Sequence, residues 1–460
     1  MMKPHYLILG KDWQLRGYRH DLNLLYNWRT IKQYYLNDMQ LAAAMMCDGQ
    51  SDFSAPAIPP EAHRFALRLQ KDGAAEACEA GQTLNPVQRY RQVPNSYIES
   101  LLLSVTNRCN FRCRHCYMEA PQGRYGELST QALFQLLDQL VEAGVPNIAL
   151  TGGEPFIRPE LPAFLRGLRD RRIGFSEIFT NASLLTDAVL DDIEDAGFRP
   201  HFKVSFDCVG NHDYMRGVPG AEEKTLCGIR LLRKRGFSVT VITSIDKVVV
   251  QGLNDTLNLL KELGVSNWWM APPMEIGAWR GSDSNVNPNE LIPALKSLLK
   301  SWYAAGRPFD MLLWRLGQYS SKGYAFQGPR TRYVDDSYNC LITHKLPFIT
   351  PDGVLLPCGS FTGSAIAQTF PNLTQTPLAQ AWEDPKLRSI CDMRKSEVLA
   401  CNPACRSCEH FVRCGSGCRV SAMLSRGNLM LSDSVCCKLH RGGYLKDFQA
   451  FAKSLDEEYR

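Results

Sequence analysis

The sequence predicts an α/β protein whose central part alternates strand and helix six times. Short apolar runs alternate with longer stretches of helical periodicity between residues 101 and 303. The 460 residues are too many for one ordinary domain, and most of the cysteines stand in the last third of the chain. We therefore expect a parallel sheet covered by helices, with a further module on each side of it.

The first module is expected over residues 1–95. Its pattern predicts a hairpin over Leu22–Asn37, a helix over Met39–Met46, a second helix over Pro60–Asp72 and a linker over Gly81–Val93. This order resembles the winged-helix-like RiPP recognition element, which binds the leader of a ribosomally made peptide by adding it as a strand to a sheet edge. A purely structural N-terminal cap is the alternative.

The six strand–helix units are predicted within residues 96–310. The strands are expected at Leu101–Val105, Asn147–Thr151, Glu177–Asn181, Phe202–Phe206, Val239–Ile245 and Trp268–Ala271. The helices are expected at Ser129–Ala143, Pro159–Arg171, Thr186–Ala196, Ala221–Arg235, Gly252–Leu263 and Asn289–Tyr303. Functional residues should then lie at the carboxyl ends of the strands, as in complete barrels.

Three cysteines follow the first strand in the order Cys-x3-Cys-x2-Cys: Cys109, Cys113 and Cys116. Three thiolates can hold a [4Fe–4S] cluster and leave one iron open. With Gly152-Gly153-Glu154-Pro155, the motif resembles the radical S-adenosylmethionine (SAM) superfamily, whose core is a (β/α)6 partial TIM barrel. The resemblance implies that the open iron binds SAM and that reductive cleavage gives a 5′-deoxyadenosyl radical. A zinc knuckle or buried thiols are the alternative.

The same resemblance implies which residues contact SAM. Glu154 would accept a hydrogen bond from the SAM ammonium group, at a turn where glycines let the backbone approach the ligand. His115 stands where the family packs a side chain on adenine. The full set of implied SAM contacts is His115, Gly152, Gly153, Glu154, Asn181, Ser205, Asp207 and Arg216. Helix capping or turn closure is the structural alternative for each, and no catalytic residue is assigned.

The last third carries a second cysteine pattern, which resembles the SPASM extension of radical SAM enzymes over residues 340–445. A bridging region over 311–339 precedes it and a C-terminal helix over 446–460 follows. The resemblance implies two auxiliary [4Fe–4S] clusters, and therefore three clusters in all. The inner one would be held by Cys340, Cys358 and Cys418, and the outer one by Cys405, Cys408, Cys414 and Cys436.

The sequence leaves two ligand questions open. No cysteine precedes Cys340 in the bridging region, so the inner cluster either has an open iron for a substrate thiolate or is closed by Cys391 or Cys401. Cys437 adjoins Cys436 and is an alternative outer ligand, although the spacing favours Cys436. Zinc sites in a rubredoxin-like knuckle are the alternative for the whole domain.

Composition limits the cellular setting. The net charge of +5, with a pI near 8.4, is too small and too evenly spread along the chain to indicate nucleic-acid binding. No apolar run reaches the roughly 18 residues of a membrane span, and the start of the chain is unlike a signal peptide. Seventeen cysteines in a chain with no expected membrane span or signal peptide indicate metal binding in a reducing cytoplasm.

The whole chain resembles the radical SAM/SPASM peptide maturases, the subtilosin type among them. The resemblance implies an enzyme that installs thioether crosslinks, from cysteine sulfur to carbon, in a ribosomal precursor peptide of the sactipeptide or ranthipeptide kind. Its partners would be that peptide and an electron donor such as flavodoxin or ferredoxin. The alternatives are C–C crosslinking, peptide oxidation or decarboxylation, sulfatase maturation to formylglycine, and a non-enzymatic Fe–S protein for peptide binding or electron transfer.

Overall fold

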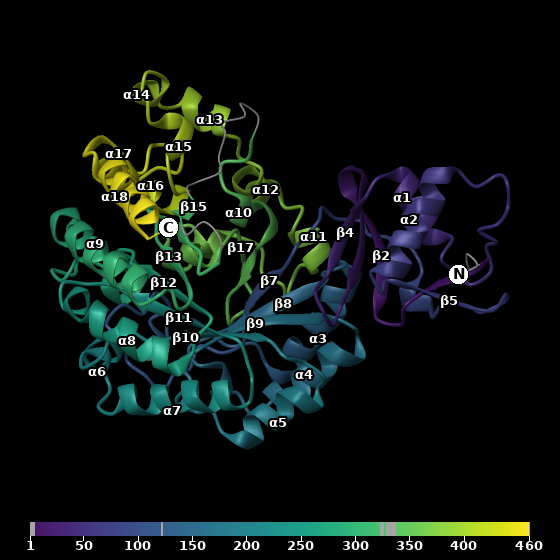
Figure 1. Cartoon of the computed structure of the whole chain (residues 1–460), viewed down its shortest axis with the longest axis horizontal. Helices are drawn as coiled ribbons and strands as arrows, with labels where there is room; N and C mark the ends of the chain where they lie inside the picture. The colour runs from purple at the N-terminus through teal and green to yellow at the C-terminus, as the bar shows by residue number, and fades with distance from the viewer. Residues whose placement is uncertain (1–4, 121–122, 323–325, 328–336, 460) are drawn as a thin grey trace.

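A long, mostly parallel sheet runs through the middle of the computed structural model, which describes residues 5–120, 123–322, 326–327 and 337–459 (Figure 1). Seven neighbouring strands are parallel and follow one another in chain order. They are β7 (Leu101–Ser104), β8 (Asn147–Thr151), β9 (Gly174–Thr180), β10 (His201–Ser205), β11 (Val239–Ser244), β12 (Asn267–Ala271) and β13 (Asp310–Leu313). This order confirms the predicted α/β core.

The predicted helices are all present and cover the outside of this sheet (Figure 1). They are α3 (Thr130–Glu142), α4 (Leu161–Asp170), α5 (Asp187–Asp195), α7 (Ala221–Lys234), α8 (Leu253–Leu263) and α9 (Pro288–Ala304), with a short α6 (His212–Arg216) before α7. Side-chain caps fix several starts: Ser129 and Thr186 accept from backbone amides of α3 and α5, and Asn287 forms a capping box with Glu290.

The sheet is longer than the sequence predicts. β13 was not expected, because its four residues follow a helix and carry little periodic signal. Beyond it, β14 (Gly317–Tyr319) and β15 (Phe326–Gln327) continue the sheet antiparallel. The predicted bridging region therefore begins as part of the core sheet; residues 323–325 and 328–336 of it lie outside the described residues.

The N-terminal module contains a four-stranded sheet in the order β4-β3-β2-β6. Its strands are β2 (Trp13–Tyr18), β3 (Leu22–Asn27), β4 (Gln33–Leu36) and β6 (Arg91–Gln92); α1 (Asp38–Met45), α2 (Pro60–Lys71) and the pair β1 (Leu7–Leu9) and β5 (Ala75–Ala77) complete it. The predicted hairpin and both helices are confirmed. The predicted linker is wrong at its end, where β6 pairs in parallel with β2.

The central strands β2 and β3 of this sheet are buried on both faces, because their side chains alternate between two cores. Tyr18, Leu24, Tyr26 and Trp28 are buried in the core of the barrel, whereas the other face packs on α1 and α2. The Tyr18 hydroxyl donates to the Gly144 carbonyl at the end of α3, at 2.5 Å. The module is therefore joined to the barrel by a continuous apolar interface.

The C-terminal third adds two strands to the other edge of the barrel sheet, and then helices. β16 (Phe348–Ile349) lies parallel to β7, and β17 (Leu355–Leu356) is antiparallel to β16. The helices are α10 (Leu341–Lys345), α11 (Leu378–Ala381), α12 (Pro385–Cys391), α13 (Lys395–Ala400), α14 (Pro403–Arg406), α15 (Phe411–Cys414), α16 (Arg419–Arg426), α17 (Ser434–Arg441) and α18 (Tyr444–Glu458).

The last helix returns to the barrel. α18 lies against α9 (Figure 1), where Lys296 pairs with Asp447 at 2.7 Å and the Tyr303 hydroxyl donates to Asp456 at 2.6 Å. Within the described part of the chain, no helix has both the length and the apolarity needed to cross a membrane.

Candidate functional site

The first cysteine loop follows β7 and is pressed against the glycine turn that follows β8. The Gly153 and Glu154 amides donate to the Thr106 and Arg108 carbonyls at 2.9 Å each. A Cβ atom at Gly153 would stand 2.2 Å from the Arg108 oxygen, and one at Gly152 would stand 2.9 Å from the Thr106 oxygen. Only glycine permits this approach. The two glycines thus seat the cysteine loop, a task that the sequence did not reveal.

The rest of the loop is held by two other barrel segments. Amides on either side of Cys113 donate to carbonyls at the end of α6, both at 2.9 Å, and the Ala278 amide donates to the Cys116 carbonyl at 3.0 Å. Main-chain hydrogen bonds therefore fix the loop near each of its cysteines.

The three thiols on this loop suit an iron–sulfur cluster. Cys109, Cys113 and Cys116 are each half-buried. Burial raises the pKa of Cys109 to about 12 and also raises that of Cys113, so both thiols are protonated until a metal displaces the proton. The Arg216 Nη1 atom lies 3.7 Å from the Cys113 sulfur and favours its thiolate. Three thiols on one fixed loop fit a cluster that keeps one iron for another ligand.

Glu154 is fully buried next to this loop. Its carboxylate accepts from the Asn181 amide and the Thr180 hydroxyl, both at 2.8 Å, and from the Phe156 amide at 3.3 Å. Burial nevertheless raises the pKa of Glu154 to about 7. Within the described residues it has no ion pair, so an ammonium group of a ligand would supply the missing cation.

Asp207 and Arg216 form a buried ion pair. Arg216 Nη2 donates to Asp207 Oδ1 at 3.0 Å, and Nε lies 2.9 Å from Oδ2. Burial alone would raise the pKa of Asp207, but the guanidinium holds it well below its usual range. The Asp207 amide in turn donates to Nδ1 of His212 at 3.1 Å. In this structure Arg216 already binds a carboxylate of the protein, so its contact with the SAM carboxylate stays a prediction.

The other predicted SAM contacts lie around the same barrel mouth. The Asn181 side chain donates to Asn110 at 2.9 Å, next to the first cysteine, and Ser205 is half-buried at the end of β10. His115 Nδ1 is buried with no hydrogen-bond partner in the described structure. Burial lowers the pKa of His115 to about 4, so its ring is neutral at physiological pH. A neutral ring suits the predicted stacking on adenine.

The predicted inner cysteines stand at the N-caps of three helical turns. Cys340 precedes α10, Cys358 precedes a 3-10 turn and Cys418 precedes α16. Burial raises the pKa of Cys358 to about 12, and the thiols of Cys418 and Cys340 raise it further. The fold therefore brings together three cysteines that are separated by up to 78 positions in the sequence (340 to 418).

The predicted outer cysteines lie among the last helices. The Cys414 and Cys436 sulfurs are 3.4 Å apart, and His440 offers a third ligand atom, with all three within 4.8 Å of one another. The Cys414 thiol and the nearby His440 lower the pKa of Cys436 to about 5. His440 was not predicted, although its i, i+4 spacing from Cys436 on α17 was a usable signal. The contact supports Cys436 over the adjacent Cys437 as a ligand.

Cys405 and Cys408 complete the predicted outer set. The Cys408 amide donates to the Cys405 carbonyl at 3.2 Å, which closes a tight turn, and the Ser416 hydroxyl donates to the Cys405 sulfur at 3.5 Å.

Asp433 connects the two groups of cysteines. Its carboxylate is fully buried and accepts from the Cys418 amide at 3.0 Å and from the Cys436 amide at 3.1 Å. Arg315, from the loop after β13, forms an ion pair with it. One side chain thus positions the backbone of an inner cysteine and of an outer cysteine.

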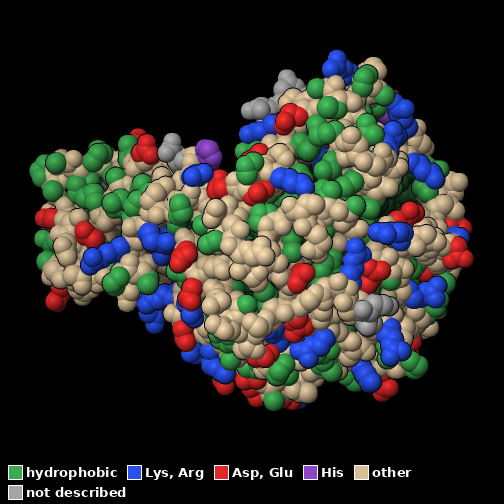
Figure 2. Space-filling model, turned by 180° about the vertical axis from the view of Figure 1, so that it is seen from behind, with side chains coloured by type: hydrophobic (Ala, Val, Ile, Leu, Met, Phe, Trp, Pro, Cys, Tyr) green, Lys and Arg blue, Asp and Glu red, His purple; other side chains and the backbone are tan. Residues whose placement is uncertain are grey.

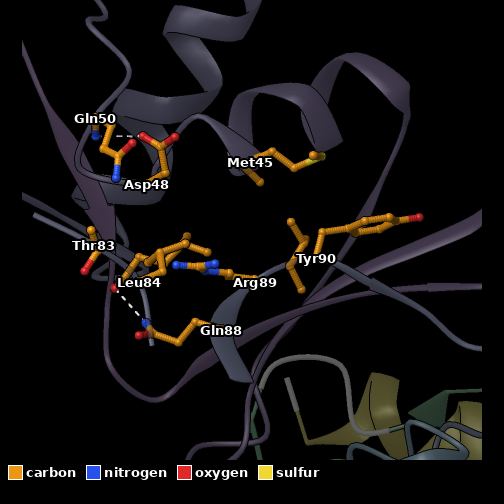
Figure 3. A pocket seen from close by; sticks show the side chains of 11 residues that line it. Met45, Asp48, Gln50, Thr83, Leu84, Gln88, Arg89 and Tyr90 are labelled. Carbon is orange, nitrogen blue, oxygen red and sulfur yellow. Dashed lines mark hydrogen bonds between the residues drawn. The ribbon is translucent and has the colours of Figure 1, made fainter. Parts of the chain in front are cut away.

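A separate hollow of about 390 Å³ lies in the N-terminal module (Figure 3). The side chains of Met45 and Tyr90 lie along one part of it, and Asp48 and Gln50 lie at another. Leu9 and Leu15 contribute to its lining. The hollow is on the helix side of the sheet and belongs to this module alone.

Comparison with known families identifies the class of this chain. Residues 103–260 match the radical SAM superfamily, and residues 340–409 match the SPASM iron–sulfur cluster-binding domain. The chain is a radical SAM enzyme with a SPASM domain. It uses SAM and several [4Fe–4S] clusters, for which the cysteine groups described above are a fitting donor set.

Curated relatives share most of the chain at low identity. The AdoMet-dependent heme synthase of Methanosarcina barkeri is 27% identical over 347 residues, which are 72% of this chain and 94% of the relative. The PqqA peptide cyclase of Gluconobacter oxydans is 27% identical over 349 residues, which are 73% of this chain and 90% of the relative.

Solved structures share the fold. Streptococcus suis SuiB bound to the precursor peptide SuiA has a TM-score of 0.66 at 15% identity and covers 94% of this chain and 99% of its own. Native anSMEcpe with bound AdoMet has a TM-score of 0.57 at 16% identity and covers 78% of this chain and 99% of its own.

Proposed function

We propose that the enzyme is a maturase that installs thioether crosslinks in a ribosomally made precursor peptide. The observation that carries this proposal is the N-terminal module. Residues 1–95 are about a fifth of the 460-residue chain, and a match that covers 94% of the chain must include most of them. The matching structure is that of SuiB bound to a precursor peptide, whereas the match to anSMEcpe covers 78%.

The module has a suitable surface for a peptide leader. β4 ends the four-stranded sheet, and in the described residues no strand pairs with its outer edge. An extended peptide can add to such an edge by main-chain hydrogen bonds. Among the described residues of the module, four large apolar side chains are exposed, namely Tyr35, Met39, Met45 and Val87. Figure 2 shows apolar side chains across this part of the molecule, at its left. The hollow beside Met45 offers room for an apolar leader side chain.

The barrel residues have defined tasks in this reaction. When bound, the cluster and SAM supply the 5′-deoxyadenosyl radical. The chain contributes the fixed cysteine loop, the Glu154 carboxylate for the SAM ammonium and the His115 ring for adenine. The acceptor carbon gives up one hydrogen atom and the substrate thiol one proton, and the electron left over returns to an iron–sulfur acceptor. A flavodoxin or ferredoxin would provide the initial electron. The crosslinked peptide therefore has two hydrogens fewer.

A second candidate is C–C crosslinking, because relatives named PqqA peptide cyclase match 73% of the chain. Both reactions remove two hydrogens from the peptide, but a thioether loses one from carbon and one from sulfur, whereas a C–C crosslink loses both from carbon. A thioether consumes the thiol, whereas a C–C bond leaves it free to react with iodoacetamide.

The test combines mass spectrometry with alkylation. The reconstituted enzyme is incubated anaerobically with SAM, a reductant and synthetic candidate precursors, which are the small cysteine-containing peptides encoded in the open reading frames around its gene. We expect the loss of two hydrogens per crosslink together with the loss of one alkylatable thiol. Loss of hydrogens with all thiols still free would favour C–C bonds, and an unchanged peptide would refute the maturase proposal.

Edge-strand variants give a matched control for docking. Tyr35→Pro breaks the β4 strand and should abolish product while SAM cleavage continues, because docking raises the local concentration of the core peptide. Tyr35→Phe keeps the strand and should behave like the parent enzyme.

A further inference from the structure

We infer that Cys391 is the fourth protein ligand of the inner auxiliary cluster, beside Cys340, Cys358 and Cys418. The inner cluster is then closed by protein thiolates and has no open iron for a substrate thiol. This inference concerns the SPASM domain alone and does not depend on which peptide bond the enzyme makes.

Backbone pairing places Cys391 next to the first inner cysteine. The Asn339 amide donates to the Met393 carbonyl at 2.7 Å. An antiparallel bridge pairs the neighbouring residues, Tyr338 and Arg394. In this register Cys340 lies opposite Asp392, the residue that follows Cys391. Two segments separated by some fifty positions in the sequence thus bring the two cysteines to neighbouring places.

Side-chain contacts also hold these two segments together. α12, which ends at Cys391, packs on α10, which begins after Cys340. Asp392 lies 2.9 Å from Nδ1 of His344 on α10, and Arg388 donates to the same carboxylate at 2.5 Å. These contacts hold the end of α12 against the start of α10.

Cys391 is buried at this junction. It is 1% exposed and belongs to the buried core against which Cys358 and Cys418 also pack. Four cysteines are the usual donor set of a [4Fe–4S] cluster.

Cys401, the other candidate for the fourth ligand of the inner cluster, differs from Cys391 in its exposure to solvent. It is exposed at the C-cap of α13, ten positions beyond Cys391. It therefore makes a matched control: a cysteine close in the sequence that lies at the surface. A closed inner cluster has the properties of an electron relay, because an exchangeable coordination position is absent.

The experiment uses the full chain with Cys109→Ala, Cys113→Ala and Cys116→Ala, because the SAM-binding cluster has an open iron that would mask the result. This parent should hold about eight irons in two clusters. Mild ferricyanide oxidation removes an iron that has no protein thiolate and leaves a paramagnetic [3Fe–4S] cluster, which electron paramagnetic resonance counts. Cys391→Ala and Cys401→Ala are compared in this background, with iron content and circular dichroism measured for each.

We expect the parent and Cys401→Ala to stay free of the [3Fe–4S] signal. Cys391→Ala should either give one such cluster per chain or lose about four irons while its helical content is retained. Cys391→Ser, which keeps the size of the side chain and can still ligate weakly, serves if the alanine variant fails to fold, with the same expected signal. A parent that already shows the signal, or Cys391 variants that keep about eight irons without it, would overturn the assignment.

Discussion

Glu154 is a carboxylate that the fold buries with no cation beside it among the residues that the structure describes. Its hydrogen bonds to Thr180 and to the Asn181 and Phe156 amides stabilise the charged form, yet burial dominates and the pKa rises to about 7. A proton is therefore held more tightly in the folded than in the unfolded protein. The contribution of Glu154 to stability is therefore greatest at acidic pH and declines as pH rises from the ordinary value of 4.5 to about 7.

The expected size of this decline is about 3 kcal/mol, since each pKa unit corresponds to about 1.4 kcal/mol. We predict that the melting temperature of the SAM-free holoenzyme falls between pH 5 and 8 relative to that of Glu154→Gln, which cannot titrate. Added SAM should reduce the decline in the parent protein only, because its ammonium group would pair with the carboxylate. Parallel pH profiles for the two proteins would show that the pKa of Glu154 is not raised.

The turn after β8 and the loop after β7 act as one element. The Gly153 and Glu154 amides position the first part of the loop, and they reach it because no Cβ intervenes. This arrangement explains why two glycines stand together in the turn immediately after β8.

Gly153→Ala should therefore displace the first cysteine loop. Its new Cβ would lie 2.2 Å from a backbone oxygen that cannot rotate away. We predict that the reconstituted variant loses about four of its roughly twelve irons and SAM cleavage with them, while the auxiliary clusters and the helical content remain. Full iron content with normal SAM cleavage would show that the loop can move aside at little cost.

At the scale of the whole molecule, the N-terminal module is part of the barrel's support. Tyr18, Leu24, Tyr26 and Trp28 are almost fully buried in the barrel core, and burial of each such side chain is worth about 2 kcal/mol. The Trp28 ring also meets Phe198 edge to face, with centroids 6.0 Å apart. Removal of the module would expose this face of the barrel to water.

We predict that deletion of residues 1–95 lowers the melting temperature of the holoenzyme and reduces its solubility, in addition to any loss of peptide binding. Differential scanning calorimetry of the deleted and full-length chains is the measurement. As a conservative control, Tyr18→Phe removes only the hydrogen bond to the Gly144 carbonyl and should cost about 1 kcal/mol. A truncated chain that melts like the full enzyme would mean that the module contributes docking alone.

The sequence by itself determined the class of the protein. The three-cysteine motif after the first strand, the glycine turn after the second and the alternating pattern predicted the α/β core and its cofactors, because these signals are local. Among the strands that it missed, β13 and β6 are short and gain stability only from pairing with strands distant in sequence.

The tertiary structure decided the relations between distant residues. It showed that Gly153 seats the cysteine loop, that Asp433 joins the two groups of auxiliary cysteines and that the segment after Cys391 pairs with the segment before Cys340. The spacing of residues along the sequence does not predict these contacts, because they depend on how separate helices and strands pack. Ligand type is a property of the residue, whereas the distance between ligands is a property of the folded chain.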